Sequence, residues 1–480
     1  MKSANFLSLT VAIVAGSLMT MDAQVTLTSL LSFSGTNGAT PGNVPEATLV
    51  QGRDGNFYGT TIEGGTNGIV GYIGGIGGFG TVFKITTNGT FTSLVSFDNT
   101  NGSNPQAGLI QASDGNFYGT TQVGPSYLGS IYQMTPAGVL TSFFSFSGAN
   151  GNEPNGLVQG ADGFLYGTTY SGGTNGYGED GTVFKISTNG TFTSLVSFDD
   201  TNGENPQAAL VQAADGEFYG TTVNGGTNGG WGTVFEITTN GRLTSLVSFD
   251  GTNGADPLST LVLGLDGALY GTTSAGGVGF AGTPYTGNGT VFKVSTNGQL
   301  TILHMFTGFP NDGANPDFNG LAPGSDGNIY GTTFFGGEYA NGSIFRISPD
   351  GSYTNIYSFD DSIDGIEPYG GLIQGNDGDF YGTTSYGGTN EFGTVFRLTV
   401  PLNPPGNQIT GVNVSGTNVL VTIQSVFAEL YQLQYRTSLT SGAWADFSGA
   451  PATGVGGPLT VTNLGGATMN QQFLRFSIIP

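Results

Sequence analysis

The chain has 480 residues, and its 37 % hydrophobic and 12 % aromatic content is too apolar for a disordered protein, despite 86 glycines. Ten basic and 33 acidic residues give a formal net charge of −23, which argues against nucleic acid or an anionic lipid surface as a partner. With no cysteine and one histidine, disulfides, cysteine nucleophiles and multi-histidine zinc sites are excluded.

Residues 1–23 have the pattern of a secretory signal peptide. Lys2 supplies a positive charge, residues 6–19 form an apolar run, and cleavage near Ala23 is expected. A membrane anchor is the alternative, but the apolar run is short for a bilayer span. No other segment has the hydrophobicity of a span. We therefore expect an exported protein, secreted or on the cell surface, whose mature chain does not cross a membrane.

One motif recurs seven times along residues 24–400. It reads Asp-Gly-x-Phe-Tyr-Gly-Thr-Thr, with Leu or Ile in place of Phe in some copies. A period of 48 to 60 residues indicates a repeat architecture. We expect the tyrosine of each copy to pack between repeats and the aspartate to bond nearby backbone amides. The seven tyrosines are Tyr58, Tyr118, Tyr166, Tyr219, Tyr270, Tyr330 and Tyr381.

Each period reads as four short antiparallel strands. Asp-Gly and Asn-Gly turns, as at Asp114-Gly115 and Asn88-Gly89, are strong hairpin signals because both residues tolerate positive φ. Stacking seven such sheets radially buries their faces, and the pattern therefore predicts an all-β fold, a seven-bladed β-propeller. The alternative is a linear β-solenoid, which favours shorter repeats and capping ends.

The phase of the repeat predicts ring closure. The mature chain opens with a fourth-type strand at residues 26–33, and the seventh copy stops after a third-type strand at 393–399. The N-terminal segment could therefore supply the fourth strand that the seventh copy lacks. Pairing the two segments would complete the last blade and remove two free sheet edges.

At these residues the chain resembles the GloVer-type, or "choice-of-anchor", bacterial tandem-repeat proteins. The shared features are the Asp-Gly-x-Phe/Leu-Tyr-Gly-Thr-Thr core, the following Gly-Gly, and Gly-Thr-Val-Phe-Lys-Ile, as at 80–85. The resemblance covers roughly residues 26–399, with Gln122-Val-Gly-Pro125 as the largest departure. It implies an exported, propeller-like surface protein and brings no catalytic residues with it.

The repeat pattern ends at the proline-rich segment 401–406, whose composition is that of a linker, and a different sequence pattern follows. Residues 407–480 carry about six short alternating runs and one tryptophan, enough for a small β-sandwich. This part is loosely similar to the fibronectin-type modules of exported bacterial proteins. We expect it to serve attachment or spacing.

Strand direction predicts that the blade-to-blade connections share one face with the loops between second and third strands. By sequence that face carries 19 acidic residues and no Lys, Arg or His. This charge suits Ca²⁺, whose ligands are carboxylate and carbonyl oxygens, or a cationic partner. The alternative is a soluble surface without a specific ion, since no complete calcium loop is present. The candidate ligands are Asp199, Asp200, Glu204, Asp360, Asp361 and Asp364.

Aromatic residues stand among glycines in the same loops. Exposed rings beside amides suit stacking on sugar faces, so we expect a glycan-binding surface. Packing against neighbouring loops is the alternative reading for each ring. The candidate ligand-binding residues are Tyr72, Tyr127, Tyr170, Tyr177, Trp231, Tyr285, Tyr339 and Tyr386, with most weight on Trp231 and Tyr177.

Three functions are compatible with these features. The first is a non-catalytic, exported propeller that binds a glycan without any cofactor other than Ca²⁺. The second is a polysaccharide hydrolase or lyase that uses paired carboxylates of the acidic face. The third is a structural surface protein without a specific ligand. His304 replaces Val or Phe of other copies, which favours a packed or surface role over catalysis.

Overall fold

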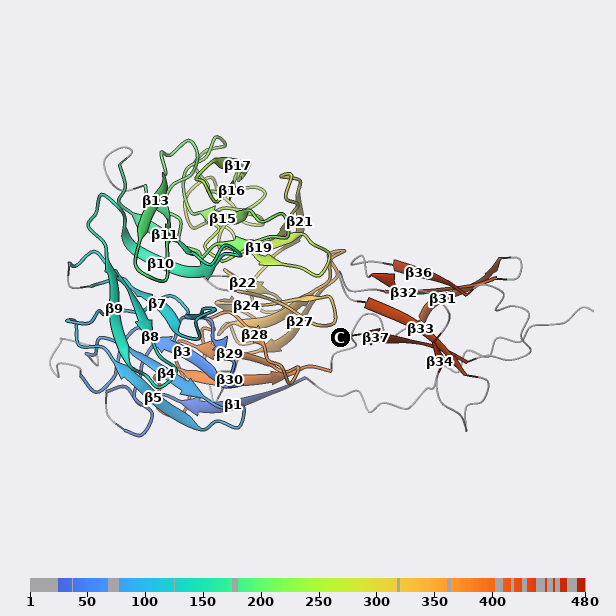
Figure 1. Ribbon diagram of the computed structural model, residues 1–480, viewed down its shortest axis with the longest axis horizontal. Coiled ribbons are helices and arrows are strands. Elements are labelled where there is room, and N and C mark those ends of the chain that lie inside the picture. Colours follow the sequence, from blue (N-terminus) through green and yellow to red (C-terminus); the bar gives the residue numbers. More distant parts are fainter. Residues whose placement is uncertain are drawn as a thin grey trace, which may run out of the picture.

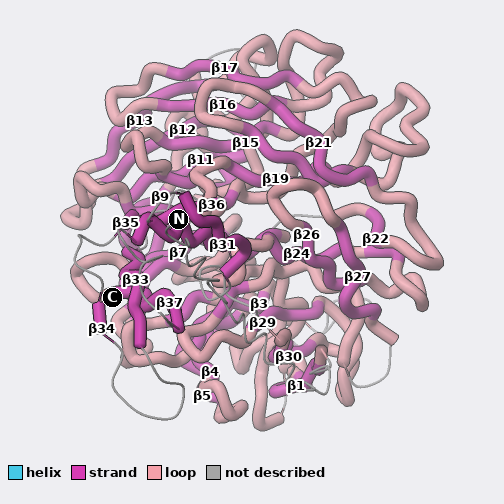
Figure 2. Tube along the Cα trace, turned by 90° about the vertical axis from the view of Figure 1, so that its right-hand side faces the viewer, coloured by secondary structure: helices cyan, strands magenta, loops and turns pink. Residues whose placement is uncertain are grey.

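The structure is a computed structural model that describes residues 25–36, 38–67, 77–124, 126–174, 180–316, 320–360 and 364–401, together with seven C-terminal strands between 409 and 479. The described elements are all β-strands, and Figure 2 accordingly shows strands and loops without a helix. Within these ranges, then, there is no helix of the length and hydrophobicity needed to cross a membrane. The expected signal peptide 1–23, Tyr72, Tyr177 and Asp361 lie outside the described residues.

Seven four-stranded antiparallel sheets succeed one another around a ring, which is a seven-bladed β-propeller (Figure 1). Blades 1 to 3 comprise β2 (Val50–Gln51), β3 (Phe57–Thr61), β4 (Thr81–Ile85) and β5 (Phe91–Ser96); β6 (Ile110–Gln111), β7 (Phe117–Thr121), β8 (Ser130–Met134) and β9 (Leu140–Ser145); and β10 (Asn152–Gln159), β11 (Leu165–Ser171), β12 (Thr182–Ile186) and β13 (Phe192–Ser197).

Blades 4 to 6 have the same strand order. They comprise β14 (Val211–Gln212), β15 (Phe218–Thr222), β16 (Thr233–Ile237) and β17 (Leu243–Ser248); β18 (Val262–Leu263), β19 (Leu269–Thr273), β20 (Thr290–Val294) and β21 (Leu300–Met305); and β23 (Leu321–Pro323), β24 (Ile329–Thr333), β26 (Ser343–Ile347) and β27 (Tyr353–Ser358). A separate two-stranded sheet between blades 5 and 6 joins β22 (Gly313–Ala314) to β25 (Phe335–Gly336).

Blade 7 combines the two ends of the repeat region, as predicted. Its order is β28 (Ile373–Gln374), β29 (Phe380–Thr384), β30 (Thr394–Thr399) and then β1 (Thr26–Ser32). The first strand pairs antiparallel with β30 over its whole length, so the blue and orange ends of the propeller lie side by side in Figure 1. The prediction that the ring closes through residues 26–33 is confirmed.

The recurring Tyr-Gly pair packs tightly, the tyrosine against the next blade and the glycine within its own blade. In blade 3, Tyr166 stacks on Phe218 of blade 4, with ring centroids 4.0 Å apart. In blade 4, a Cβ on Gly220 would lie 2.6 Å from Phe235 Cζ and 2.8 Å from Leu210 Cδ2, so only glycine fits beneath them. The expected packing role of the tyrosines is therefore confirmed.

Each of these tyrosines also donates a hydrogen bond that the sequence did not reveal. The hydroxyl group of Tyr58 donates to Asp54 Oδ2 at 2.8 Å, while Asp54 Oδ1 accepts the backbone N–H of Asn56 at 3.2 Å. The tyrosine–aspartate bond recurs in all seven blades at 2.7–2.9 Å. Each Asp-Gly turn is thereby tied to the blade core.

The C-terminal strands form two antiparallel sheets. In one, β31 (Ile409–Ser415), β32 (Asn418–Gln424) and β36 (Pro458–Asn463) lie in this order. In the other, β33 (Leu430–Arg436) pairs with three strands, which are β34 (Ala445–Asp446), β35 (Ala452–Thr453) and β37 (Phe473–Ile479). The all-β prediction holds for this part, and a fibronectin-like sandwich remains a prediction.

Candidate functional site

The seven blade-to-blade connections meet on one face of the propeller, which we call the connection face. Each turns at a residue with left-handed φ placed directly before a proline. At Asn205, for example, the N–H donates to Asp180 O of the preceding blade at 2.9 Å, and the C=O accepts Val223 N–H at 3.2 Å. The seven residues are Val44 (55°), Asn104 (56°), Glu153 (54°), Asn205 (54°), Asp256 (54°), Asn315 (52°) and Glu367 (56°).

The left-handed residue turns the chain from the rim towards the centre. The proline after it restricts the direction in which the chain continues, because its own φ is fixed near −65°. A left-handed conformation costs a non-glycine residue of order 1 kcal/mol, and it recurs here in every blade. The residues that follow each proline consequently start the innermost strand at the ring centre.

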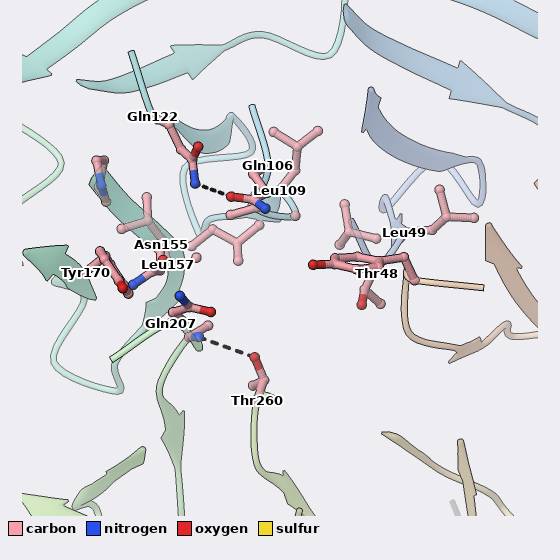
Figure 3. Close-up of a pocket in the computed structure, with 18 of the residues that line it drawn as sticks. Thr48, Leu49, Gln106, Leu109, Gln122, Asn155, Leu157, Tyr170, Gln207 and Thr260 are labelled. Atoms are coloured by element: carbon pink, nitrogen blue, oxygen red, sulfur yellow. Dashed lines mark hydrogen bonds between the residues drawn. The ribbon is translucent and has the colours of Figure 1, made fainter. Parts of the chain in front are cut away.

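A cavity of about 360 Å³ opens at this centre (Figure 3). Its volume is within the range of small-molecule sites, about 300–1,000 Å³. All seven blades contribute to its wall. One lining residue from each blade, in order, is Thr48, Gln106, Asn155, Gln207, Thr260, Leu321 and Tyr369.

Carboxamides are concentrated on the arc of blades 2 to 4. Gln122 Nε2 donates to Gln106 Oε1, and Gln106 Nε2 donates to Glu46 Oε2 at 3.4 Å. Gln207 Oε1 is buried and has no hydrogen-bond partner among the described residues. Tyr170 lies beside these amides on the same arc. This arc is therefore rich in groups that both donate and accept hydrogen bonds.

Blades 5 to 7 give the cavity a less polar arc. Val262, Leu321 and the ring of Tyr369 line it. Two threonine hydroxyl oxygens accept backbone N–H groups across blade borders: Thr260 Oγ1 from Ala209 at 3.2 Å, and Thr48 Oγ1 from Gly371 at 3.2 Å. Apolar residues such as Leu109 and Leu157 also line the arc of blades 2 to 4, so the cavity has apolar surface all round and carboxamides on one side.

Negative charge at the cavity comes from two glutamates. Glu153 is the one carboxylate among its described lining residues. Glu46 borders it through Gln106, and burial raises the pKa of Glu46 to about 7, with the Gln106 hydrogen bond opposing the rise and the charge of Glu63 adding to it. Burial also raises the pKa of Tyr170, and Glu153 adds to that rise. The site thus disfavours further negative charge.

The predicted aromatic residues are dispersed. Of the candidates among the described residues, Tyr170 alone lines the cavity. Trp231 is half-buried and packs edge-on against Phe280, with ring centroids 5.1 Å apart. The remaining described candidates are exposed on loops of the connection face and do not line the cavity; they are Tyr127, Tyr285, Tyr339 and Tyr386.

The predicted calcium ligands are partly engaged in shaping the connections. Asp199 Oδ1 accepts Thr201 Oγ1 at 2.8 Å and Asn202 N–H at 3.1 Å, and Asp364 Oδ2 accepts the Tyr357 hydroxyl. In the part of the chain that the structure describes, no three His, Cys, Asp or Glu side chains are grouped as metal ligands. Calcium binding by these residues stays a prediction, as it does for Asp200, Glu204 and Asp360.

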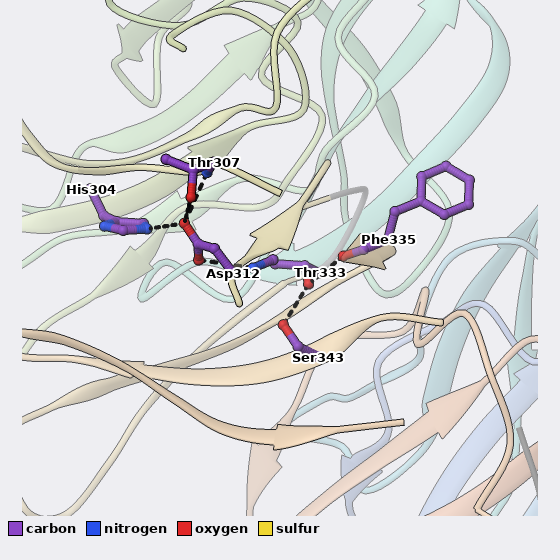
Figure 4. A network of polar contacts seen from close by, with 7 residues as sticks. His304, Thr307, Asp312, Thr333, Phe335 and Ser343 are labelled. Atoms are coloured by element: carbon purple, nitrogen blue, oxygen red, sulfur yellow. Dashed lines mark hydrogen bonds and ion pairs between the residues drawn. The ribbon is translucent and has the colours of Figure 1, made fainter. Parts of the chain in front are cut away.

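His304 belongs to a packed polar network on the blade 5–6 border (Figure 4). Its Nε2 lies 3.0 Å from Asp312 Oδ2, and its ring stacks on Tyr353 at 3.7 Å between centroids. The same aspartate accepts the N–H groups of Thr307 at 2.9 Å and Gly313 at 2.8 Å. The histidine therefore has the packed role expected from the sequence.

The sequence does not predict the amide arc, because the motif Asn-Pro-Gln-Ala at 104–107 and 205–208 gives no sign that its glutamine faces the ring centre. The residue after the proline varies in the other blades, and only knowledge of the ring shows that these positions lie together. The signal was nonetheless present, since the seven prolines are in register with the repeat. They are Pro45, Pro105, Pro154, Pro206, Pro257, Pro316 and Pro368.

Comparison with protein families gives one match. The profile of the Gloeobacter/Verrucomicrobia repeat matches residues 10–178, 68–285 and 282–404, which together span the propeller. The C-terminal strands lie outside these ranges. No curated protein matches the sequence significantly.

Solved structures of similar architecture share little sequence with this chain. The extracellular domain of a putative hybrid two-component system from B. thetaiotaomicron is 14 % identical, with a TM-score of 0.49 over 92 % of this chain and 55 % of its own. PorZ, a surface component of the type-IX secretion system of Porphyromonas gingivalis, is 9 % identical, with a TM-score of 0.46 over 93 % and 60 %. The chain thus spans somewhat over half the length of both.

A third structure is a polysaccharide lyase described as an ulvan lyase, bound to a GlcA–Rha3S saccharide. It is 11 % identical to this chain, with a TM-score of 0.42 over 91 % of this chain and 98 % of the lyase. At such identities these likenesses concern the fold.

Proposed function

The chain belongs to the Gloeobacter/Verrucomicrobia repeat family, and we propose that this member is an exported, non-catalytic propeller that binds a glycan in the central cavity of its connection face. The observation that carries the proposal is the lining of that cavity. Four carboxamides, those of Gln106, Gln122, Asn155 and Gln207, occupy one arc, and aromatic and aliphatic side chains make up much of the remaining wall.

A sugar ring presents the complementary chemistry. Its hydroxyl groups both donate and accept hydrogen bonds, as carboxamides do, and its C–H face packs on an aromatic ring. The cavity volume of about 360 Å³ suits one or two sugar units.

Binding is favoured over hydrolysis by the carboxylates present. Glycoside hydrolysis uses two carboxyl groups on either side of the scissile bond, about 5–9.5 Å apart. Glu153 stands without a second carboxylate among the described lining residues, and Glu46 is hydrogen-bonded to Gln106 at the border. An enzyme of this class would need its second carboxylate to come from elsewhere.

A glycan array followed by calorimetry on the strongest ligand tests the proposal. We expect Gln207→Ala and Tyr369→Ala each to weaken binding at least tenfold, because each removes a cavity group. Tyr127→Ala is the matched control, since that side chain is 75 % exposed and lies outside the cavity lining. Thermal unfolding of each variant verifies that the fold is retained.

Two outcomes would contradict the proposal. One is that the wild-type protein binds no glycan on the array. The other is a loss of binding in Tyr127→Ala with none in Gln207→Ala, which would move the site from the cavity to the rim. Turnover of the bound glycan by the wild-type protein would replace the non-catalytic assignment with an enzymatic one.

A further inference from the structure

The charge around the cavity restricts which saccharides fit. None of the described lining residues is Lys, Arg or His, and the whole connection face lacks these residues by sequence. Glu153 places a carboxylate in the wall itself. A ligand carboxylate or sulfate would therefore meet a like charge without any cation to pair with.

Glu46, at the border of the cavity, illustrates the cost of burying an anion here. Beside the cavity, burial raises the pKa of Glu46 to about 7, although Gln106 donates a hydrogen bond to it. An amide donor thus fails to compensate for the loss of water around a carboxylate here. A ligand anion entering next to the same amides would bear the same desolvation cost.

The two arcs of the wall suit an uncharged sugar. The amides of blades 2 to 4 offer donors and acceptors that suit hydroxyl groups without charge, while Val262, Leu321 and Tyr369 offer apolar surface that suits the C–H groups of a sugar. Gln207 Oε1, the buried acceptor without a partner among the described residues, can accept a hydrogen bond from a hydroxyl group, whereas a carboxylate or sulfate oxygen has no hydrogen to donate to it.

From these contacts we infer that the cavity accepts an uncharged saccharide unit and excludes uronate and sulfated saccharides. This inference rests on the proposed glycan-binding function and specifies its ligand class. The specificity arises from the wall of the cavity, with Glu153 as the residue that repels acidic ligands. Selection by charge in this way uses an unfavourable contact as well as favourable ones.

The experiment compares pairs of oligosaccharides of equal length. Neutral gluco-, manno- and galacto-trisaccharides are titrated against the corresponding glucuronate, mannuronate and galacturonate trisaccharides, at low and at physiological ionic strength. We expect at least one neutral ligand to bind tenfold or more tightly than its acidic counterpart, which equals about 1.4 kcal/mol. Low salt should widen the ratio because screening is weaker.

The outcomes separate the inference from the proposed function. Equal or tighter binding of an acidic member would overturn the inference and leave glycan binding intact. Binding of none of the six ligands, together with an empty glycan array, would remove both. Preference for neutral ligands at both salt concentrations supports both.

A charge variant assigns the effect to the cavity. Glu153→Gln keeps the size of the side chain and its φ of 54°, and it should narrow the neutral-to-acidic affinity ratio at least threefold. Glu391→Gln is the matched control, because Glu391 has a φ of 67° and an exposed carboxylate on the same face, outside the cavity lining. A ratio that responds equally to both changes would show that the general field of the face, and not the cavity wall, discriminates, and would overturn the inference.

Discussion

Glu46 follows the proline of the first connection and contacts groups from two blades. Its Oε2 accepts Gln106 Nε2 of blade 2, and Glu63 of its own blade adds electrostatic repulsion. Burial is the largest influence, and it raises the pKa of Glu46 to about 7 from the usual 4.5. Tyr386 lies within reach of the charges of both glutamates. A perturbed carboxyl group beside a cavity is typical of functional sites.

This pKa makes a prediction about stability. Because the folded-state value lies above the unfolded one, the native state holds the proton more tightly, and that contribution is complete below pH 4.5 and lost as the pH rises through about 7. The wild-type protein loses this stability as Glu46 ionises, whereas Glu46→Gln has no carboxyl group to ionise. The unfolding free energy of Glu46→Gln relative to wild type should therefore rise by about 1–3 kcal/mol between pH 4 and 8. Urea unfolding across this range measures it.

Glu391→Gln serves as the comparison, since it removes an exposed carboxylate from the same face. Parallel pH profiles for the two variants would show that the environment of Glu46 is not special. An increase confined to Glu46→Gln would support the buried carboxyl group at the cavity border.

Single residues differ in how far the sequence reveals them. The Tyr-Gly pair is predictable because it recurs without change in every copy. Gln106 and Gln207 share the motif Asn-Pro-Gln-Ala and Asn155 does not, and the three become a site only when the ring brings blades 2 to 4 together. Trp231 looked exposed because its loop is polar, whereas it packs on Phe280 of the next blade's loop. Sequence reasoning thus recovers repeated contacts better than contacts made once.

The innermost strands of five blades end in a glutamine that joins neighbouring blades. The side-chain Oε1 of Gln111 accepts Arg53 N–H of blade 1 at 2.8 Å, and its Nε2 donates to Gly115 O in its own turn at 2.9 Å. Gln51 accepts Asn376 N–H of blade 7 at 3.0 Å, so the same link spans the closure of the ring. The other three are Gln159, Gln212 and Gln374.

A pair of substitutions tests whether the interface between blades 7 and 1, which closes the ring, contributes as much stability as the interface between blades 1 and 2. Gln51→Ala and Gln111→Ala should each lower the unfolding free energy by about 0.5–1.5 kcal/mol, since each loses comparable hydrogen bonds. Hydrogen exchange should accelerate at Asn376 in the first variant and at Arg53 in the second. A cost for Gln111→Ala with none for Gln51→Ala would indicate that blades 1 and 7 are not joined in solution.

The four-strand period itself was predictable, since Asp-Gly and Asn-Gly turns delimit the strands. Differences between blades were not. The segment from Pro154 to Leu157 of blade 3 is the shortest of the seven, with one residue fewer than in blades 1, 2, 4, 5 and 7 and two fewer than in blade 6. Its strand β10 runs unbroken over eight residues with a register shift at that point. The β22–β25 pair likewise depends on how the connection after β21 folds over blade 6. Such features follow from lengths and packing that no local motif encodes.

The propeller as a whole depends on β1, which belongs to blade 7 by pairing and to blade 1 by packing. Beyond its pairing with β30, the strand is followed by Phe33, which is fully buried. The Phe33 ring contacts Phe83 and Phe91 of blade 1, at 5.2 and 6.2 Å between centroids. The short segment from β1 to Phe33 therefore holds the first and last blades together.

Deleting residues 25–33 should consequently destabilise the whole ring. The deletion leaves β30 as an unpaired outer edge and uncovers the site of Phe33, so we expect a lower melting temperature and aggregation. Phe33→Ala isolates the packing contribution and should cost about 3–5 kcal/mol. A synthetic peptide of residues 25–36 added in trans should restore part of the lost stability by pairing with β30, as donated strands do in other sheets. An unchanged melting temperature after the deletion, with no effect of the peptide, would mean that the ends of the repeat region do not close the ring.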